Sequence, residues 1–368
     1  MSAVVEHEFR ADLRETARGF LRRSGSLAST RPVIEEATRP LELERQIAEL
    51  GWLGVEVPEE HGGLGGSFGD LAVILHELGR VASPSAFTTT AVLGVGALLT
   101  GTHDQQARWL GRVAIGDAIV TAALTGSGGA RDRVDIELRD SRLEGVADFV
   151  PDLRDADALV VAARGESDAD EALFLLSTDT PGLAIEPYAT VDRTRRLDRL
   201  VLTGVEVTDG QRLQSGGEAR RVRDHLLARG ALAVACDAVG GCERILEMTV
   251  EYLSERRQFG RPIGSFQALK HRAADMLYET EGSRSAVDHA AERIGEADGE
   301  VAVSIAKSYA GDAYVHVAEE GVQLHGGIGF TWDHELHLYL KRARLGQLLF
   351  GDSAWHREVL ASAAMARS

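Results

Sequence analysis

The chain has 368 residues, of which 44% are hydrophobic and 26% charged, and its formal net charge at pH 7 is -17. This length is enough for two or three domains with a buried core. The negative charge argues against nucleic acid as a partner. No apolar run reaches membrane-spanning length, and the N-terminus, with Glu6 and Glu8, has no signal-peptide pattern. Cys236 and Cys242 are too few for a disulfide framework and fit no metal spacing, so we expect a reducing cytoplasm, no membrane and no metal site.

The first 117 residues carry the hydrophobic period of α-helices. Two apolar faces are formed by Leu41, Leu43, Ile47 and Leu50, and by Leu71, Ile74, Leu75, Leu78 and Val81. A glycine-rich loop at residues 54–66 separates them. Its place between two amphipathic helices favours an ordered loop over a flexible linker. We expect residues 1–117 to form an N-terminal helical domain.

From residue 118 the helical period gives way to short apolar or alternating runs. They cover residues 118–124, 134–138, 143–150, 158–163, 172–176 and 200–207. Clusters of Gly, Asp, Pro and Ser separate them, which is typical of antiparallel β-structure. We therefore expect a middle antiparallel β-domain at residues 118–215. Long helical patterns return afterwards and predict a C-terminal helical bundle at residues 216–368.

The C-terminal region contains a helix that ends at a run of arginines. Apolar residues at helical spacing continue to Leu253, and Gly260 with Pro262 ends the pattern. Arginines at positions 256, 257 and 261 crowd this end, and Ser265 is placed to cap the next helix. Arginines at a helix C-terminus stabilise the helix dipole in many proteins, so this motif alone has a structural explanation.

A second motif lies downstream, at residues 323–330. It contains a Gly-Gly-x-Gly turn formed by Gly326, Gly327 and Gly329. Without side chains in the way, the backbone of such a turn can approach a flat or phosphorylated ligand. Gly-Gly is often only a turn, so this motif is also weak by itself. The two motifs together, in this order and spacing, are far more specific.

Together the two motifs resemble the signature segments of the acyl-CoA dehydrogenase family, flavoenzymes that oxidise the Cα–Cβ bond of acyl thioesters. The resemblance covers nearly the whole chain. It implies an α+β fold with an N-terminal α-helical domain, a middle antiparallel β-domain and a C-terminal four-helix bundle, and it implies FAD as the cofactor. Residues matching these positions contact the FAD of a neighbouring subunit or its adenosine diphosphate part in the family: Arg256, Phe259, Gln267, Gln323, Gly326 and Gly327.

The resemblance also points to the edge and wall of the flavin ring in the middle domain. The first family segment matches residues 124–127, where Thr125 is the implied flavin-edge donor. The second matches residues 149–151, where Phe149 is the implied wall of the ring. Pro151 departs from the family pattern, because it offers neither a hydroxyl nor a backbone N–H. The alternative for Thr125 is a simple turn hydroxyl.

Proton abstraction needs a carboxylate base beside the substrate. The family places this glutamate at one of two positions, which match Phe350 and Gly230 here, and neither is acidic. Asp352 is a candidate for a displaced base, although the N-cap of the following helix is the stronger interpretation. Asp237 is a second candidate, for which pairing with an arginine in the interior is an equally good explanation.

Residues 329–340 resemble actinobacterial members of the family that degrade sterol side chains. Such proteins work as heterotetramers in which one subunit carries the glutamate and its homologous partner completes the flavin site. This chain resembles the partner that lacks the glutamate. The resemblance implies an acyl-CoA substrate and an electron-transfer flavoprotein as electron acceptor. His325 and the run Trp332-Asp333-His334 are interpreted as packing and interface residues.

Other functions remain open from the sequence. A self-sufficient dehydrogenase, a homo-oligomer with a displaced base such as Asp352, would bind FAD and oxidise acyl-CoA alone. A flavin monooxygenase or oxidase on the same fold would use oxygen and need no glutamate. A non-enzymatic binding or scaffold protein would hold no flavin with any partner.

Overall fold

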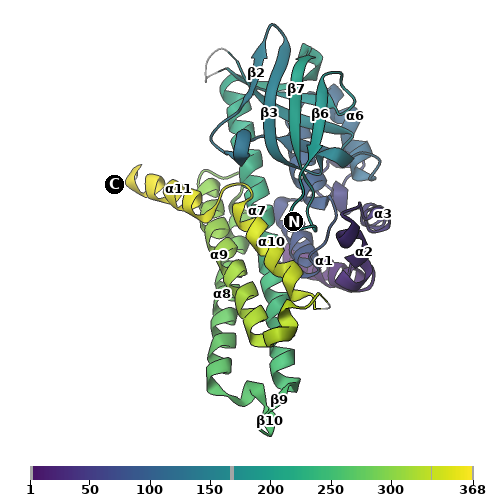
Figure 1. The fold of residues 1–368 in the computed structure, drawn as a ribbon. Helices are drawn as coiled ribbons and strands as arrows, with labels where there is room; N and C mark the ends of the chain where they lie inside the picture. The colour runs from purple at the N-terminus through teal and green to yellow at the C-terminus, as the bar shows by residue number, and fades with distance from the viewer. Residues whose placement is uncertain (1–2, 166–169, 333, 367–368) are drawn as a thin grey trace. The chain divides into compact units, whose positions relative to one another are not determined.

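The computed structural model describes residues 3–165, 170–332 and 334–366 (Figure 1). Contacts between residues group the chain into two compact units that interleave along the sequence. The first unit consists of Met1–Pro32, Ala72–Ser83 and Ala231–Ser368, and the second of Val33–Leu71 and Pro84–Gly230. The domain boundaries at residues 117 and 215 stay a prediction.

The helices follow the hydrophobic period of the sequence. They are α1 (Ala3–Ser24), α2 (Leu27–Glu36), α3 (Leu41–Glu49), α4 (Phe68–Arg80), α5 (Val95–Leu98), α6 (His103–Ala114), α7 (Gly216–Glu255), α8 (Gln267–Arg293), α9 (Gly299–His325), α10 (Leu336–Leu348) and α11 (Ser353–Ala366). A π-helical segment, η3 (Thr88–Gly94), precedes α5. Helix α3 stops before Gly51 because that residue has a φ of 73°, a conformation that glycine adopts without strain.

The strands form one large sheet in the second unit. They are β1 (Val120–Ala123), β2 (Ile136–Arg139), β3 (Arg142–Pro151), β4 (Ala158–Arg164), β5 (Glu171–Ser177), β6 (Leu183–Pro187), β7 (Leu197–Glu206) and β8 (Arg212–Ser215). Their order is β6-β7-β3-β2-β4-β5-β8, with β1 beside β4. The expected runs all contain strands, and β6 and β8 are additional. Most pairs are antiparallel, as predicted, but β1 and β2 each run parallel to β4.

Strand β3 contains an irregularity that matters for the site. Ala147 pairs with Leu200 and Val150 with Asp198, so Asp148 and Phe149 together face the single residue between those partners. This is a β-bulge, which bends a strand and redirects its side chains. Phe149 accordingly has a φ of 56° and a ring that is 39% exposed.

The first unit is a helical bundle in which α9 packs against α8, α10 and α11. Helices α4 and α7 approach closely: a Cβ added at Gly79 would lie 2.2 Å from the backbone oxygen of Asp237, and one at Gly240 would lie 2.0 Å from that of His76. The expectation that Ser265 caps α8 is wrong. Its hydroxyl donates to the backbone oxygen of Pro262 at 2.7 Å, because a 3-10 turn places it one residue too early.

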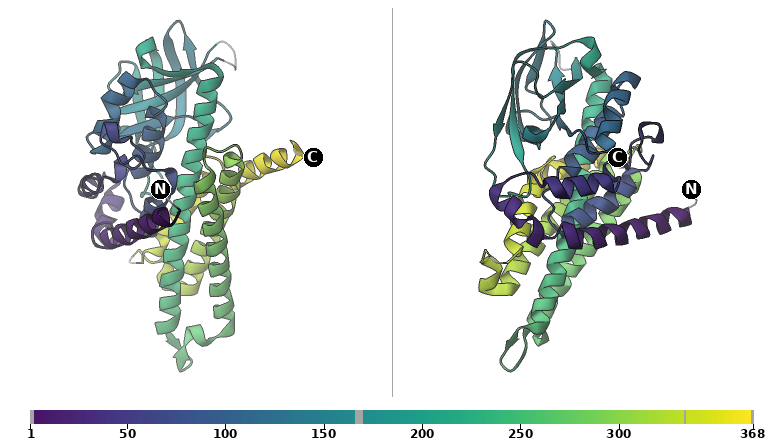
Figure 2. Two further views of the ribbon diagram at one scale, coloured as in Figure 1. Left: turned by 180° about the vertical axis from the view of Figure 1, so that it is seen from behind. Right: turned by 90° about the vertical axis from the view of Figure 1, so that its right-hand side faces the viewer.

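A two-stranded hairpin, β9 (Arg257–Gln258) and β10 (Arg261–Pro262), connects α7 to α8. It lies at the end of the bundle opposite to α11 (Figures 1 and 2). Within residues 3–165, 170–332 and 334–366, no helix is long and apolar enough to cross a bilayer. The same residues include no cluster of side chains suited to holding a metal ion.

Candidate functional site

The hairpin and its flanks, residues 256–262, form a cationic tip. Arg256, Arg257 and Arg261 are exposed, and in the described part of the chain none of them forms an ion pair. The guanidinium of Arg261 lies 4.1 Å from the ring centroid of Phe266, a cation–π contact. Phe259 is 91% exposed, and its φ of 53° is unusual for a residue with a side chain. The tip therefore presents positive charge and an aromatic ring to something outside this chain's own fold.

The glycine turn follows the last residue of α9. Gly326 has a φ of 64° and a ψ of -142°, which a side chain would strain. A Cβ added at Gly326 or Gly327 would meet no atom within 4 Å. Gln323 and both glycines are exposed, as is Gln267 at the start of α8. The backbone of this turn is thus open to a ligand.

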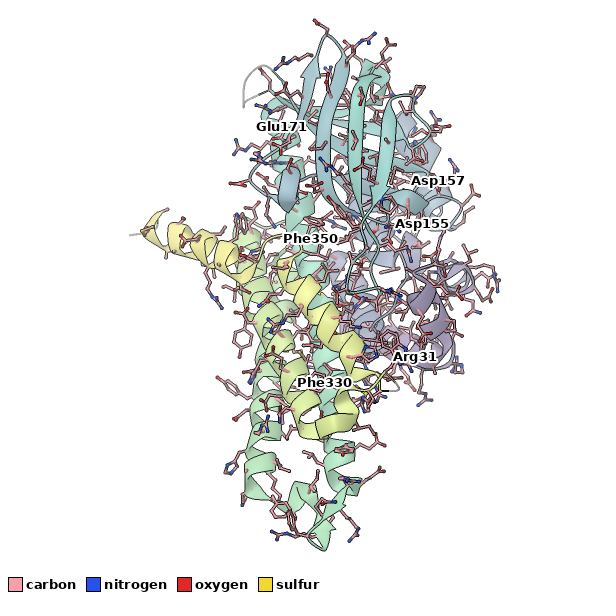
Figure 3. The ribbon with its side chains drawn as sticks, viewed as in Figure 1. Arg31, Asp155, Asp157, Glu171, Phe330 and Phe350 are labelled. Atoms are coloured by element: carbon pink, nitrogen blue, oxygen red, sulfur yellow. The ribbon has the colours of Figure 1, made fainter. Side chains whose placement is uncertain are left out.

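The position of the expected base lies in the turn between α10 and α11, where Figure 3 labels Phe350. Its φ of 57° places it in the left-handed region. Lys307, which is fully buried in α9, donates to the backbone oxygens of Gln347 at 3.0 Å and Gly351 at 2.9 Å. The Nε2 of His356 lies 3.1 Å from the backbone oxygen of Phe350. The loop therefore keeps a fixed geometry, although the side chain at the position of the expected base is the phenyl ring of Phe350.

The other candidate bases are engaged in structural contacts. Asp352 accepts the backbone N–H of Trp355 at 2.8 Å and so caps α11. Asp237 is 4% exposed and accepts two hydrogen bonds from Arg342, at 2.6 Å and 3.0 Å. Gly230 is buried in the middle of α7. A carboxylate with a buried guanidinium partner is stabilised in its charged form and is a poor proton acceptor.

The tip, the glycine turn and the base position do not converge within one chain. Lys307 contacts Gly351, whereas Gly326 follows the end of the same helix. At 1.5 Å per residue, these two points of α9 are separated by about 28 Å. Figure 3 labels Phe330, beside the glycine turn, and Phe350 at different levels along the bundle. Figures 1 and 2 place the tip and α11 at opposite ends of the bundle.

The loop with Thr125, in the second unit, is occupied by the chain's own carboxylates. The backbone N–H of Gly128 donates to Asp148 at 2.7 Å, and that of Ser127 donates to Asp135 at 2.8 Å. The Thr125 hydroxyl donates at 3.4 Å to the backbone oxygen of Asp148. Burial alone would raise the pKa of Asp135, but hydrogen bonds from Ser127 and the nearby Arg133 lower it. The donors of this loop are therefore already satisfied.

The bulge of β3 places Phe149 beside this loop. Its ring packs against Tyr188, with centroids 5.0 Å apart, and the Tyr188 hydroxyl donates to Asp148 at 2.7 Å. Burial and this hydrogen bond raise the pKa of Tyr188 to about 12. The backbone oxygen of Pro151 accepts the Thr121 hydroxyl at 2.6 Å. Asp148 and Asp135 thus give the surroundings of the implied flavin edge an acidic character.

The histidines near the glycine turn are packed against aromatic rings. His325 is 4% exposed, stacks on Tyr252 at 4.5 Å and meets the edge of His334 at 4.7 Å. Trp332 stacks on His337 at 4.7 Å, and the ammonium group of Lys341 lies 4.9 Å from its ring centroid. Asp333 lies outside the described residues. These contacts agree with the packing interpretation.

Sequence reasoning missed Asp148 and Lys307. An aspartate next to the predicted flavin wall was a usable signal for the first. The second was visible as one of only three lysines in the chain, placed inside an alanine-rich helix. A lysine in such a helix has few carboxylates in reach, and the helix itself is buried, so carbonyl oxygens become its partners.

The sequence matches known families over most of its length. The family model for the acyl-CoA dehydrogenase N-terminal domain matches residues 7–117, and that for the C-terminal domain matches residues 220–365. The chain therefore belongs to the acyl-CoA dehydrogenase family, oxidoreductases that use FAD to oxidise the CH–CH bond of acyl-CoA.

Among its relatives is the acyl-CoA dehydrogenase IpdE2 of Mycobacterium tuberculosis, 33% identical over 91% of both chains. Another is the acyl-CoA dehydrogenase FadE34 of the same organism, 34% identical over 98% of this chain but only 48% of that protein. The solved ChsE4–ChsE5 complex of Mycobacterium tuberculosis is 29% identical with a TM-score of 0.89, covering 98% of this chain and 97% of the other. A steroid ACAD, Tcur3481–Tcur3483, is 30% identical with a TM-score of 0.88, covering 98% and 99%.

Proposed function

We propose that this chain is the supporting subunit of a FAD-dependent acyl-CoA dehydrogenase, in which a homologous subunit carries the catalytic glutamate. The assembly would be a heterotetramer in the cytoplasm that acts on acyl-CoA and passes electrons to an electron-transfer flavoprotein. In this assembly the tip and the glycine turn of this chain serve a flavin held by its partner.

The observation that carries the proposal is the contrast between the tip and Phe350. The three arginines of the tip form no ion pair among the described residues, and Phe259 is 91% exposed. The loop at Phe350 keeps its geometry through Lys307 but has no carboxylate at the expected base position. A chain that retains contacts for a flavin and lacks the base is expected to work with another chain that has it.

The residues of this chain fit FAD across an interface and not in its own middle domain. Arginines at the tip suit an anionic pyrophosphate, because guanidinium groups form charge-assisted hydrogen bonds with phosphate oxygens. The open backbone at Gly326 and Gly327 allows close approach of a flat ligand. In the chain's own β-domain, Asp148 takes the N–H of Gly128, and Pro151 has no N–H to offer. A flavin edge there would have to displace a carboxylate.

When bound, FAD supplies the two-electron acceptor for the oxidation. The part of this chain is to hold and orient the partner's cofactor through Arg256, Phe259 and Gln267. The partner's glutamate would take the α-proton. The relatives support this division of labour: one is solved as a complex of two named chains, and FadE34 is about twice as long as this chain.

The test is flavin retention in the complex co-purified with its homologous partner. Arg256→Ala is expected to release most of the FAD, measured by absorbance of the denatured supernatant, and to abolish acyl-CoA oxidation. Arg344→Ala is the matched control, because Arg344 is exposed and its ion pair among the described residues is with a surface glutamate, Glu319. It should leave flavin content unchanged.

Two outcomes would overturn the proposal. One is full flavin retention by the Arg256→Ala complex. The other is stoichiometric FAD and acyl-CoA oxidation by this chain purified alone, which would make it a self-sufficient dehydrogenase. Turnover of reduced flavin with oxygen in the absence of acyl-CoA would favour a monooxygenase or oxidase instead.

A further inference from the structure

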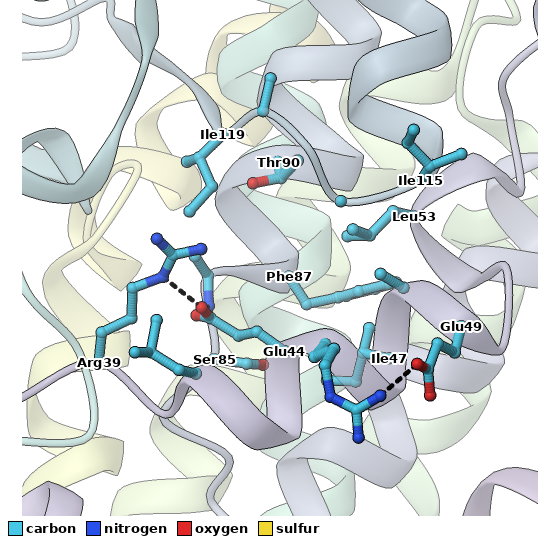
Figure 4. Close-up of a pocket in the computed structure, with 16 residues that line it drawn as sticks. Arg39, Glu44, Ile47, Glu49, Leu53, Ser85, Phe87, Thr90, Ile115 and Ile119 are labelled. Carbon is cyan, nitrogen blue, oxygen red and sulfur yellow. Dashed lines mark hydrogen bonds and ion pairs between the residues drawn. The ribbon is translucent and has the colours of Figure 1, made fainter.

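The second unit contains a cavity of about 460 Å³ that no part of the proposed flavin assembly uses. It lies between α3, the residues at the start of η3, and residues 115–119 before β1 (Figure 4). Ligand sites of proteins enclose about 300–1,000 Å³. The cavity therefore has the size for a small organic molecule, at the lower end of that range.

Its walls are mainly apolar. Ile47 and Phe87 are each 1% exposed and form its inner surface. Leu41 and Ile115, which also line it, are 65% and 69% exposed. Large apolar side chains left open around a concave apolar surface favour an apolar occupant, because its binding removes their surface from water.

Thr90 gives the cavity a buried polar group. Thr90 is 2% exposed and belongs to the π-helical segment η3. π-Helical geometry is rare in proteins overall, but where it occurs it is often at a functional site. Among the described residues, no hydrogen bond to its hydroxyl is found. Figure 4 shows this hydroxyl directed into the space between Ile119 and Arg39. Since none of the described residues forms a hydrogen bond with this hydroxyl, a ligand oxygen in the cavity would give it a partner.

Arg39 supplies a positive charge at the same side of the cavity. Its Nε pairs with Glu44, and the other carboxylate oxygen of Glu44 accepts the backbone N–H of Ala86 at 3.0 Å. Glu44 is thereby held in place by two groups. No partner of the terminal nitrogens of Arg39 is found in the part of the chain that the structure describes. Two terminal guanidinium nitrogens are the geometry that receives a carboxylate in a bidentate manner.

We propose that this cavity binds an unesterified carboxylic acid with a compact apolar body. The carboxylate lies against Arg39 and the Thr90 hydroxyl, and the apolar body fills the space between Ile47, Phe87 and Ile119. The cavity is a second ligand site, separate from the flavin contacts of the tip, and the proposal does not depend on the proposed function.

The experiment is isothermal titration calorimetry of the full chain, in its co-purified complex, with decanoate and with 1-adamantanecarboxylate. At least one acid is expected to bind saturably, with a dissociation constant below about 1 mM. The two probes distinguish a linear from a polycyclic body. Arg39→Met, which keeps the apolar stem of the side chain, is expected to weaken binding by about 10-fold or more, since a charge-assisted hydrogen bond is lost. Thr90→Val is expected to weaken it by about 3- to 10-fold.

Arg142→Met is the matched control. Arg142 does not line the cavity and pairs with Glu206 at the surface, so its loss should leave the affinity unchanged. Thermal melting of each variant checks that it is folded. Absence of saturable binding for both acids, equal affinity of the Arg39→Met variant, or an equal loss with Arg142→Met would each overturn the proposal. So would undiminished binding of methyl decanoate relative to decanoate, because an ester carries no charge for Arg39.

Discussion

The interior of the helical bundle and the tip at its end differ in how their charged side chains are compensated. In the interior, Asp237 is paired with Arg342, and Lys307 donates to two backbone oxygens. At the tip, three arginines are exposed and without an ion pair in the described residues. Both regions belong to the same unit, and the hairpin of the tip follows α7, the helix that carries Asp237.

This difference separates structural from functional charge. A buried charge must be compensated inside the chain, because its transfer from water is costly. An exposed arginine remains solvated and needs no such partner, so its presence at the tip has to be explained by something other than the fold. Changes in the interior should therefore reduce stability, whereas changes at the tip should affect only binding.

The largest effect is expected from the buried ion pair. Asp237→Asn leaves the Arg342 guanidinium buried without its counter-charge, and should lower the free energy of unfolding by about 3–5 kcal/mol. Urea-induced unfolding, followed by circular dichroism, measures it. Replacing both residues by leucine should cost less than the single change, because no charge is then left unpaired. A single-variant loss under about 1 kcal/mol would contradict the structural role.

The second largest effect is expected in the loss of stability of the fold at low pH. Glu243 lies 2.8 Å from both His76 and Arg80. Burial would raise the pKa of Glu243, but the hydrogen bond from His76 and the surrounding charges hold it at about 2. A lowered pKa stabilises the fold above the unfolded value, about 4.3. About 3 kcal/mol of stability should therefore be lost as pH falls from about 4.3 to 2.

The control for this dependence of stability on pH is the variant Glu243→Gln, which has no carboxyl group to protonate at that position. In the unmodified protein, burial alone would lower the pKa of His76, but its hydrogen bonds with Glu243 and Glu77 raise it. Unfolding curves measured between pH 6 and pH 2 should be flatter for the variant. Identical slopes in the two proteins would show that Glu243 is not the group responsible.

A smaller loss is expected for Lys307→Met. The backbone oxygens of Gln347 and Gly351 lose a donor, and leaving such groups unsatisfied costs about 1–3 kcal/mol. Lys270→Met is a matched control at an exposed position of α8, expected to change stability by less than about 0.5 kcal/mol. If the two variants unfold at the same urea concentration, Lys307 does not hold the loop.

The smallest effect on the chain itself is expected at the tip. Phe259→Gly removes a ring that is 91% exposed and relieves a φ of 53°. The stability of the isolated chain should change by less than about 1 kcal/mol, in the stabilising direction. In the complex with the partner subunit, the same variant should retain less FAD. If the variant destabilised the isolated chain and the complex kept its normal flavin content, Phe259 would serve the stability of the chain and not the binding of flavin.

Much of the fold followed from the sequence, because hydrophobic periods and turn residues act locally. The helical character of the N- and C-terminal regions and six strands of the sheet were anticipated, whereas β6 and β8 were not. The β-bulge at Asp148 and Phe149 was not, since an extra residue in one strand is defined only by pairing with β7. The prediction that Ser265 caps α8 was wrong for a similar reason. Ser265 belongs to a 3-10 turn, and α8 therefore begins one residue later than a cap at Ser265 requires.

The candidate site was predictable in its residue types and not in its arrangement. The sequence alone determined that the tip carries three arginines, and that neither position at which the family resemblance implies a base, Phe350 or Gly230, is acidic, because these are matters of residue identity. Only the tertiary structure decided that Asp148 accepts the backbone N–H of Gly128, near Thr125, and that Lys307 holds the loop at Phe350. Those partners lie 20 and 44 residues away along the chain, and folding alone brings them together.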